Sequence, residues 1–189
     1  MMLPINFLPP ALHDRLLPLN TNRIIAGLRG VMAELGFQKP LIINGMHPVL
    51  GLAMLGKLSE AGTIYYCFDE ITLANWMSKH GGRAELTYLR RVSAVVTTSE
   101  TLRRAKAPLQ PRAFCVKNGV DFPLFSQVRA LIAARPPQTR PVVGYLGTAD
   151  DRIDIDIVEH CARTMPDVTF QFIGEIKEPA ITADRKSVV

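Results

Sequence analysis

Two carboxylates and one histidine follow short apolar runs that the sequence predicts as strands. Asp69 and Glu70 come directly after the run 63–68, and His47 lies in the loop after the run 41–43. Ligands of open parallel α/β sheets bind outside the carboxyl ends of the strands. Asp69, Glu70 and His47 are therefore candidate catalytic residues, which would orient substrate hydroxyl groups or accept a proton. Two plainer alternatives stay open: a carboxylate that caps the following helix, and a histidine with no role in chemistry.

A glycine-containing loop forms a second candidate site. Residues 142–146 predict a strand, and Gly147 and Thr148 open the loop that leads to a helix expected at 153–164. Backbone amides at the beginning of a helix attract phosphate groups, and an arginine adds charge-assisted hydrogen bonds. Gly147, Thr148 and Arg152 are therefore candidate residues for binding a phosphate.

A short polar segment joins two alternating arrays of strands and helices. Asn118 and Gly119 tolerate positive φ, so this segment predicts a sharp turn at which one array stops and the next begins. We expect one domain at residues 1–117 and a second at residues 118–189. Asn118, Gly119 and Asp121 would set the angle between the domains or line a cleft between them.

Helical and strand-like patterns alternate along the chain. This alternation predicts the α/β class with parallel sheets, arranged as two Rossmann-like domains that are both incomplete. The prolines of residues 1–20 predict irregular backbone, and Gly81 and Gly82 predict a flexible break. The expected strands are 41–43, 63–68, 92–96, 113–116, 142–146 and 168–173. The expected helices are 21–35, 49–58, 73–78, 85–90, 124–134 and 153–164, with one more between Ser99 and Pro108.

The composition is that of an ordinary globular protein. Hydrophobic residues make up 48% and charged residues 21% of the chain, and no apolar run approaches the roughly 18 residues that a membrane helix requires. Cys67, Cys115 and Cys161 form no CxxC pair that would indicate zinc or redox exchange, so we expect buried thiols in a reducing compartment. These features predict a cytoplasmic protein.

The net charge of +5 is concentrated in the first part of the chain. Residues 1–121 hold 14 Lys and Arg against 8 Asp and Glu, whereas residues 122–189 hold 8 against 9. Such an excess suits an anionic membrane surface, a phosphorylated lipid or a nucleic acid, or it is simply a solvated face of the protein. The basic residues that cluster here are Lys79, Arg83, Arg90, Arg91, Arg103, Arg104, Lys106, Arg112 and Lys117.

Five short segments, taken in order, resemble the landmarks of GT-B glycosyltransferases. The closest likeness is to bacterial enzymes of the group that contains the teichuronic acid glycosyltransferases. No single segment is specific, and the order and spacing of all five carry the resemblance. The segments are Tyr65–Glu70, Val95–Leu102, Lys117–Asp121, Val143–Gly147 and Phe172–Gly174.

The resemblance implies two Rossmann-like domains with a cleft between them, in which the first domain holds the acceptor and the second holds a nucleotide-sugar. It implies sugar transfer to a glycan, a lipid-linked acceptor or a cell-envelope polysaccharide, without a metal or another cofactor. It also implies that the chain is an internal fragment, inactive by itself. With the basic first domain, we expect a cytoplasmic enzyme in peripheral contact with an anionic membrane at its inner face.

The glycine loop departs from the pattern of the wider family. Relatives often place an arginine straight after this glycine and a lysine further on, whereas this chain has Thr148 and then Asp150 and Asp151. Those carboxylates would repel a diphosphate, so they are expected to cap the following helix instead.

Two rival functions draw on other features of the sequence. Residues 51–57 are similar to a P-loop motif. However, Leu58 occupies the position at which a P-loop has a serine or threonine that binds magnesium, and the preceding residues predict a helix. The pI of 9.3 suits a nucleic-acid-binding module, although no reader motif accompanies the charge. A basic α/β nucleic-acid- or nucleotide-binding module without transferase activity is therefore the alternative, and nucleic acid is not the expected partner.

Overall fold

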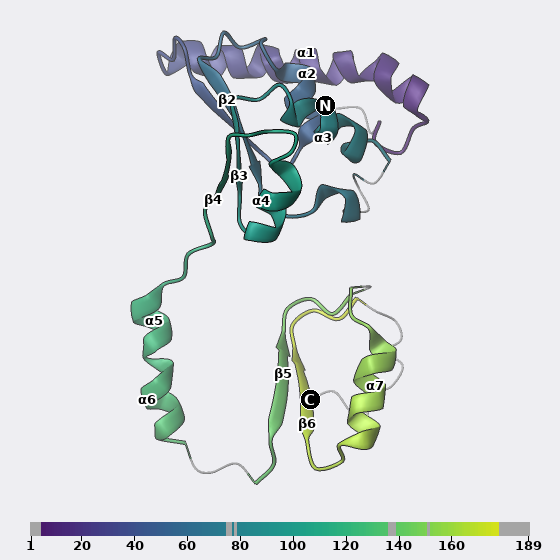
Figure 1. The fold of residues 1–189 in the computed structure, drawn as a ribbon, viewed down its shortest axis with the longest axis vertical. Helices are drawn as coiled ribbons and strands as arrows, with labels where there is room; N and C mark the ends of the chain where they lie inside the picture. Colours follow the sequence, from purple (N-terminus) through teal and green to yellow (C-terminus); the bar gives the residue numbers. More distant parts are fainter. Residues whose placement is uncertain (1–4, 75–76, 78, 136–138, 151, 178–189) are drawn as a thin grey trace. The chain divides into compact units, whose positions relative to one another are not determined.

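The computed structural model describes residues 5–74, 77, 79–135, 139–150 and 152–177. The chain divides into two compact units, unit 1 at residues 1–120 and unit 2 at residues 121–189 (Figure 1). The division falls after Val120, whereas the sequence predicts a boundary after Lys117. Over the described ranges, no helix combines the length and the apolar character needed to cross a bilayer.

Unit 1 is an α/β unit built on four parallel strands in the order β1-β2-β3-β4. Because each crossover leads to the next strand in the same direction, right-handed connections place the intervening helices on one face. Figure 1 shows β2, β3 and β4 side by side, with α3 and α4 on the same side of them. The elements are α1 (Pro10–Glu34), β1 (Leu41–Gly45), α2 (Pro48–Met54), β2 (Gly62–Cys67), the 3₁₀ helix η1 (Ile71–Leu73), α3 (Gly81–Leu89), β3 (Ala94–Thr97), α4 (Glu100–Lys106) and β4 (Ala113–Cys115).

The core of unit 1 lies between this sheet and its helices. It contains two aromatic rings at its centre, Tyr65 of β2 and Tyr88 of α3, in edge-to-face contact with centroids 5.3 Å apart. The other buried members are Cys67, Leu89, Val92 and Val95. The opposite face of the sheet is open, since Ile43 is 65% and Phe114 is 55% exposed. Parallel sheets are normally covered on both faces, but within the described part of unit 1 this face has no second layer of helices.

Unit 2 contains a parallel pair of strands, β5 (Val142–Leu146) and β6 (Thr169–Ile173), connected by α7 (Ile155–Thr164). Two short helices, α5 (Phe122–Ser126) and α6 (Val128–Ala133), precede the strands. None of the residues in these five elements is buried. A two-stranded sheet is marginal by itself, so the described residues of unit 2 form no core comparable to that of unit 1. The α/β class with parallel sheets is confirmed in both units.

Residues 10–20 are more regular than the sequence predicts. The helix expected at 21–35 begins at Pro10 and continues through Pro18, so the prediction of irregular backbone is wrong. Pro10 is compatible with a helix start because the first amides of a helix have no intrahelical partner. Burial of His13, Thr21 and Ile25 against the rest of unit 1 offsets the hydrogen bond lost at Pro18. The helix ends at Glu34, and Gly36 follows its C-cap Leu35 with a φ of +71°, which suits a glycine.

One further local prediction is wrong for a reason of packing. Gly81 and Gly82 begin α3 and form no flexible break. A Cβ atom on Gly81 would lie 3.1 Å from Cβ of Met77, so glycine permits close approach there. The helix expected at 73–78 falls in large part on positions 75, 76 and 78, which lie outside the described residues; Leu73, where it was expected to begin, is the last residue of η1.

The sharp turn expected at Asn118 and Gly119 is absent. Residues 116–121 carry no turn, and the positive φ angles of the described backbone occur elsewhere, at Met46 and Ser59 and at Gly36, Gly56, Gly147 and Gly174. The helix expected at 124–134 begins earlier, because the Asp121 side chain accepts a hydrogen bond from the Leu124 amide, and it is interrupted at Gln127.

Gly51 offers a test of the packing between α2, the sheet and α3. A Cβ atom there would lie 2.7 Å from Cζ of Tyr88 and closer still to the Asn44 amide. We expect Gly51→Ala to lower the free energy of unfolding by about 1–3 kcal/mol, because the buried Tyr88 ring has to move. Urea denaturation followed by circular dichroism measures this change.

Gly27 is the matched control for this substitution. It lies in α1, and a Cβ atom there would meet nothing within 4 Å. Gly27→Ala should therefore raise the free energy of unfolding by about 0.5–1 kcal/mol, the ordinary gain from replacing a helical glycine. Equal effects of the two substitutions would contradict the packing at Gly51.

Candidate functional site

A buried ammonium group lies between two carboxylates in unit 1. Lys106 Nζ, at the end of α4, donates to Oε2 of Glu85 at 2.8 Å and to Oε2 of Glu70 at 3.1 Å. The side chains of Lys106 and Glu85 are only 7% and 5% exposed, whereas that of Glu70 is 30% exposed. The ion pair between Lys106 and Glu85 is therefore buried, and Glu70 connects it to solvent.

Strand β2 supplies two further members of this cluster. The Tyr65 hydroxyl donates to Oε1 of Glu85 at 2.9 Å, and the Cys67 thiol lies 3.8 Å from the same oxygen. Tyr65 and Cys67 are two residues apart and face the covered side of the sheet. We call Tyr65, Cys67, Glu70, Glu85 and Lys106 the carboxylate cluster. It lies at the carboxyl end of β2, where ligands of parallel α/β sheets bind.

The environment sets the ionisation of the carboxylate cluster. Burial raises the pKa of Cys67 to about 11, with a further contribution from the charge on Glu85, so the thiol is neither a nucleophile nor a metal ligand at neutral pH. Burial alone would lower the pKa of Lys106, but its contacts with Glu85 and Glu70 outweigh burial and raise it. Partial burial would raise the pKa of Glu70, but hydrogen bonds from Thr72 and Lys106 outweigh it and hold this pKa below 4.5.

Glu70 caps η1 and also exposes part of its carboxylate to solvent. Its Oε1 accepts hydrogen bonds from the Thr72 amide at 3.3 Å and the Thr72 hydroxyl at 2.9 Å. Glu70 therefore caps η1, which is the capping role that the sequence left open as an alternative to catalysis. Its neighbour Asp69 is exposed, and Asp69 Oδ1 accepts from the Glu70 amide. Because a carboxylate with a lowered pKa is a weak base, Glu70 is better suited to accept hydrogen bonds from hydroxyl groups than to remove a proton.

His47 lies at the end of a neighbouring strand, after β1. Its Nδ1 accepts a hydrogen bond from the Leu50 amide at 3.3 Å and caps α2. Burial lowers the pKa of His47, so the ring is neutral near pH 7. The loops after β1 and β2 meet through the contacts of Met46 and Val49 with Ile71. His47 therefore has a structural explanation, and its predicted catalytic role stays a prediction.

The glycine loop of unit 2 uses much of its backbone to join β5 to β6. The amides of Gly147 and Ala149 donate to the carbonyls of Ile173 and Glu175 at 3.0 and 2.9 Å. Gly147 has a φ of +150°, and a Cβ atom on Gly174 would collide with the carbonyl group of Gly147. Thr148 accepts from the Tyr145 hydroxyl through its carbonyl oxygen. The amides of Gly147 and Ala149 are thus already occupied, which reduces the donors that a phosphate would find.

The charged residues of this loop pair with each other. Arg152 Nε and a terminal guanidinium nitrogen donate to the two oxygens of Asp150 at 2.8 and 2.7 Å, in an exposed bidentate pair. The helix α7 is capped by Asp154, which accepts from the Ile157 amide. The prediction that Asp150 caps this helix is therefore wrong, and Asp151 lies outside the described residues. Arg152 remains a candidate phosphate ligand that is held by a carboxylate.

The segment between the two units carries the last group of candidates. Asn118, Gly119 and Asp121 are exposed, and Asp121 caps α5. Their predicted place in an interdomain cleft stays a prediction. Of the three cysteines, Cys67 is buried as predicted, whereas Cys115 and Cys161 are only partly buried. Among the described residues, no three His, Cys, Asp or Glu side chains gather as metal ligands do.

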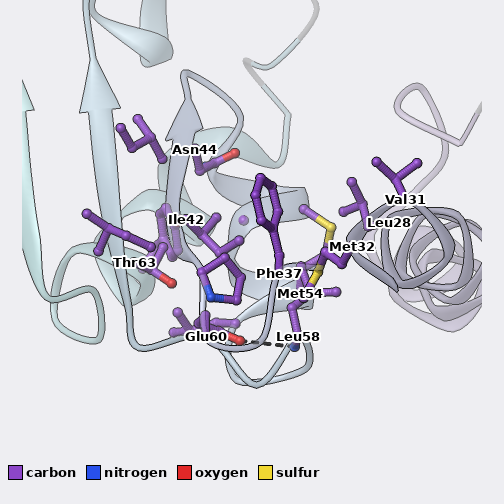
Figure 2. Close-up of a pocket in the computed structure, with 16 residues that line it drawn as sticks. Leu28, Val31, Met32, Phe37, Ile42, Asn44, Met54, Leu58, Glu60 and Thr63 are labelled. Carbon is purple, nitrogen blue, oxygen red and sulfur yellow. Dashed lines mark hydrogen bonds between the residues drawn. The ribbon is translucent and has the colours of Figure 1, made fainter. Parts of the chain in front are cut away.

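An apolar hollow in unit 1 lies away from the carboxylate cluster. Figure 2 shows Leu28 and Val31 of α1 on one side, Ile42 and Thr63 on the other, and Phe37 between them. This pocket has a volume of about 350 Å³ and is lined mainly by apolar side chains. Its carboxylate, Glu60, accepts from the amides of Gly56 and Leu58 and is used in the turn. It therefore adds no reactive group to the candidate site.

Sequence reasoning missed the two buried charges of the carboxylate cluster. Lys106 was counted only among the clustered basic residues, and Glu85 was only the first residue of the helix expected at 85–90. A signal for burial does exist for Lys106, because it follows Leu102 by four residues and precedes Leu109 by three, and both leucines pack against the core. Glu85 likewise lies three residues before the buried Tyr88. Helical spacing from core residues would have placed both charges inside.

Removal of the buried cation provides a quantitative test. We expect Lys106→Met to lower the free energy of unfolding by about 3–5 kcal/mol, because Glu85 would be left buried without its partner. The double variant Lys106→Met/Glu85→Gln should recover at least half of that loss, since the uncompensated charge is gone while an acceptor for Tyr65 remains. Urea denaturation at pH 7 measures both, and Lys57→Met, at an exposed lysine, is the control.

The contact between Lys106 and Glu70 predicts that the stability of the protein falls in acid. Because the pKa of Glu70 is lowered in the folded state, its contribution is present above pH 4.5 and is lost as the pH falls through the folded-state pKa. Lys106→Met should remove part of this dependence. A wild-type and a variant protein that lose stability in parallel between pH 6 and pH 3 would contradict the pairing.

Comparisons with known proteins give no family assignment. No protein-family model matches this chain, and no curated protein sequence shows significant similarity to it.

Proposed function

We propose that the chain is part of a GT-B-like glycosyltransferase that transfers a sugar from a nucleotide-sugar to a glycan, a lipid-linked acceptor or a cell-envelope polysaccharide. The observation that carries the proposal is the position of the sequence landmarks. Asp69 and Glu70 follow β2, and Gly147 and Gly174 directly follow β5 and β6, so the landmarks of each unit lie at the carboxyl ends of parallel strands. Active sites of open α/β sheets lie there.

On the acceptor side, the proposal assigns hydroxyl recognition to Asp69 and Glu70. An acceptor hydroxyl must be held in line with the anomeric carbon, and ionised carboxylates are strong acceptors for such hydrogen bonds. Lys106 donates to both oxygens of Glu70 and the Thr72 hydroxyl donates to one of them, which orients the carboxylate before substrate arrives. His47, as the cap of the helix after β1, is assigned a supporting position in this role.

On the donor side, the proposal assigns the diphosphate to the loop that begins at Gly147. GT-B enzymes stabilise the departing diphosphate with helix N-termini, amides and basic side chains, without a metal. Two amides of the loop are engaged in strand pairing, so Arg152 carries most of the expected attraction. Its pair with Asp150 must loosen for it to turn to a phosphate, and Thr148 would contribute its hydroxyl group.

The open faces of both units support the expectation that each domain is incomplete. One face of the four-stranded sheet exposes Ile43 and Phe114, and the elements of unit 2 bury no side chain. Further strands and helices would have to cover these surfaces in an active enzyme. We therefore propose that this chain alone does not turn over a nucleotide-sugar, and that the complete enzyme works in the cytoplasm in contact with the anionic inner face of the membrane.

The donor assignment is tested by titrating the full chain with UDP and following ligand signals by NMR. Asp150→Asn should strengthen binding by about two- to fivefold, because it removes a repelling charge and releases Arg152 from its carboxylate. Arg152→Ala should weaken binding by a similar factor. Arg163→Ala is the matched control, since Arg163 is also an exposed arginine paired with a carboxylate, Glu159.

Three outcomes separate the possibilities. Absence of UDP binding at millimolar concentration, or equal binding by all variants, would contradict the donor assignment. Salt-dependent retention on immobilised DNA without UDP binding would favour the basic nucleic-acid-binding module instead. Turnover of a nucleotide-sugar by the chain alone would support the transferase activity. It would contradict the proposal that this chain alone is inactive.

A further inference from the structure

Two histidines are stacked face to face between α1 and the beginning of α3. The rings of His13 and His80 have centroids 3.8 Å apart and planes inclined by 12°. His13 is 2% and His80 is 5% exposed. His13 belongs to the first turns of α1, and His80 immediately precedes Gly81, where α3 begins. The stack therefore joins the N-terminal half of α1 to the rest of unit 1.

The partners of each ring determine which nitrogen carries its proton. His13 Nδ1 lies 3.0 Å from a carboxylate oxygen of Asp14, and His80 Nε2 lies 3.1 Å from the carbonyl oxygen of Leu8. Both partners can only accept, so these two nitrogens carry hydrogen and donate. The remaining nitrogens, His13 Nε2 and His80 Nδ1, are then bare acceptors in neutral rings.

Neither bare nitrogen reaches water or a hydrogen-bond donor. His13 Nε2 and His80 Nδ1 are buried, and neither has a hydrogen-bond partner among the described residues. A hollow of about 320 Å³ lies beside the rings, but these two nitrogens are closed off from it. A proton added to either one would create a buried N–H without an acceptor, directly against a second imidazole.

The surrounding charges only partly compensate for such a proton. Asp14, next to His13 on α1, faces the pair, but its other oxygen accepts from Arg83 of α3 at 2.8 Å. Lys79 adds positive charge on the side of His80, where its ammonium group donates to the Phe7 carbonyl. The single carboxylate at the stack is thus already shared with an arginine, and two protonated rings at 3.8 Å would repel each other.

We propose that the His13–His80 stack is an acid-sensitive clasp: it holds the N-terminal half of α1 on unit 1 at neutral pH and releases it in mildly acidic solution. Release lets the His80 ring take up a proton in water. It also separates Asp14 from Arg83 and opens the hollow that α1 shares with α2 and α3, which Leu17 and Val49 help to line. The clasp lies wholly within unit 1 and does not depend on the proposed transferase activity.

The direction of the effect follows from the environment of His80. Burial, then the adjacent His13 ring and Lys79, lower the pKa of His80 below 6.5, while the Leu8 carbonyl and Asp14 act in the opposite sense. A histidine whose pKa is lowered in the docked state binds fewer protons there than in the released state. Docking is therefore fully stabilised above pH 6.5 and weakens as the pH falls through the lower value.

Hydrogen exchange of the full chain at pH 7.5 and pH 5 tests the clasp. After correction for the intrinsic exchange rate, we expect amide protection in residues 13–20 to fall about tenfold or more at the lower pH, the equivalent of one pKa unit. Protection in β2 should change far less. His80→Gln keeps a donor for the Leu8 carbonyl but does not titrate, so it should reduce the pH effect on α1.

A control and a second measurement keep the proposal open to refutation. His160→Gln, at an exposed histidine of α7, should leave the wild-type pH effect unchanged. Should His80→Gln not fold, an NMR titration of the wild-type chain replaces it: the midpoint for His80 protonation should coincide with the loss of protection in α1. Equal protection at both pH values, a full pH effect in His80→Gln, or protonation of His80 without opening of α1 would each overturn the clasp.

Discussion

The ion pair between Lys106 and Glu85 is the interaction on which the candidate site of unit 1 depends. It joins α4 to α3 beneath the carboxyl end of β2, and the third partner, Glu70, extends it to the surface. A buried ion pair contributes little net stability compared with apolar packing, because desolvation offsets the attraction. Its value here is positional, since one ammonium group fixes a carboxylate at the edge where parallel sheets bind ligands.

The sequence predicted the frame of the fold because that frame depends on local pattern. Short apolar runs located all six strands to within about two residues, and Ser99 caps α4 as its type suggests. The N-terminal half of α1 was missed because its prolines argue against a helix, whereas the burial that stabilises this helix depends on tertiary contacts that the sequence does not show. The turn at Asn118 and Gly119 was wrong for a related reason: these residues permit positive φ but do not require it.

The candidate site was predicted only in part, and the missing part is the buried part. Asp69 and Glu70 were found because they follow a strand directly, which is a local feature. Lys106 and Glu85 are distant in sequence from Glu70, and only the three-dimensional structure brings them together. The stack of His13 and His80 is of the same kind, since its members are 67 positions apart in the numbering of the chain. Pairings of this kind depend on which helix faces meet.

The two units differ in how firmly the surrounding structure holds their candidate residues. In unit 1, a closed core and the carboxylate cluster give Glu70 a fixed orientation, so its chemistry can be argued from geometry. In unit 2, the loop at Gly147 is shaped by strand pairing, but the residues around it bury almost nothing. Electrostatic attraction is weak at such an exposed site, because water screens Arg152 from a ligand as it screens it from Asp150. A covering layer that excludes water would therefore strengthen a donor site at this loop, whereas the carboxylates after β2 are already positioned without one.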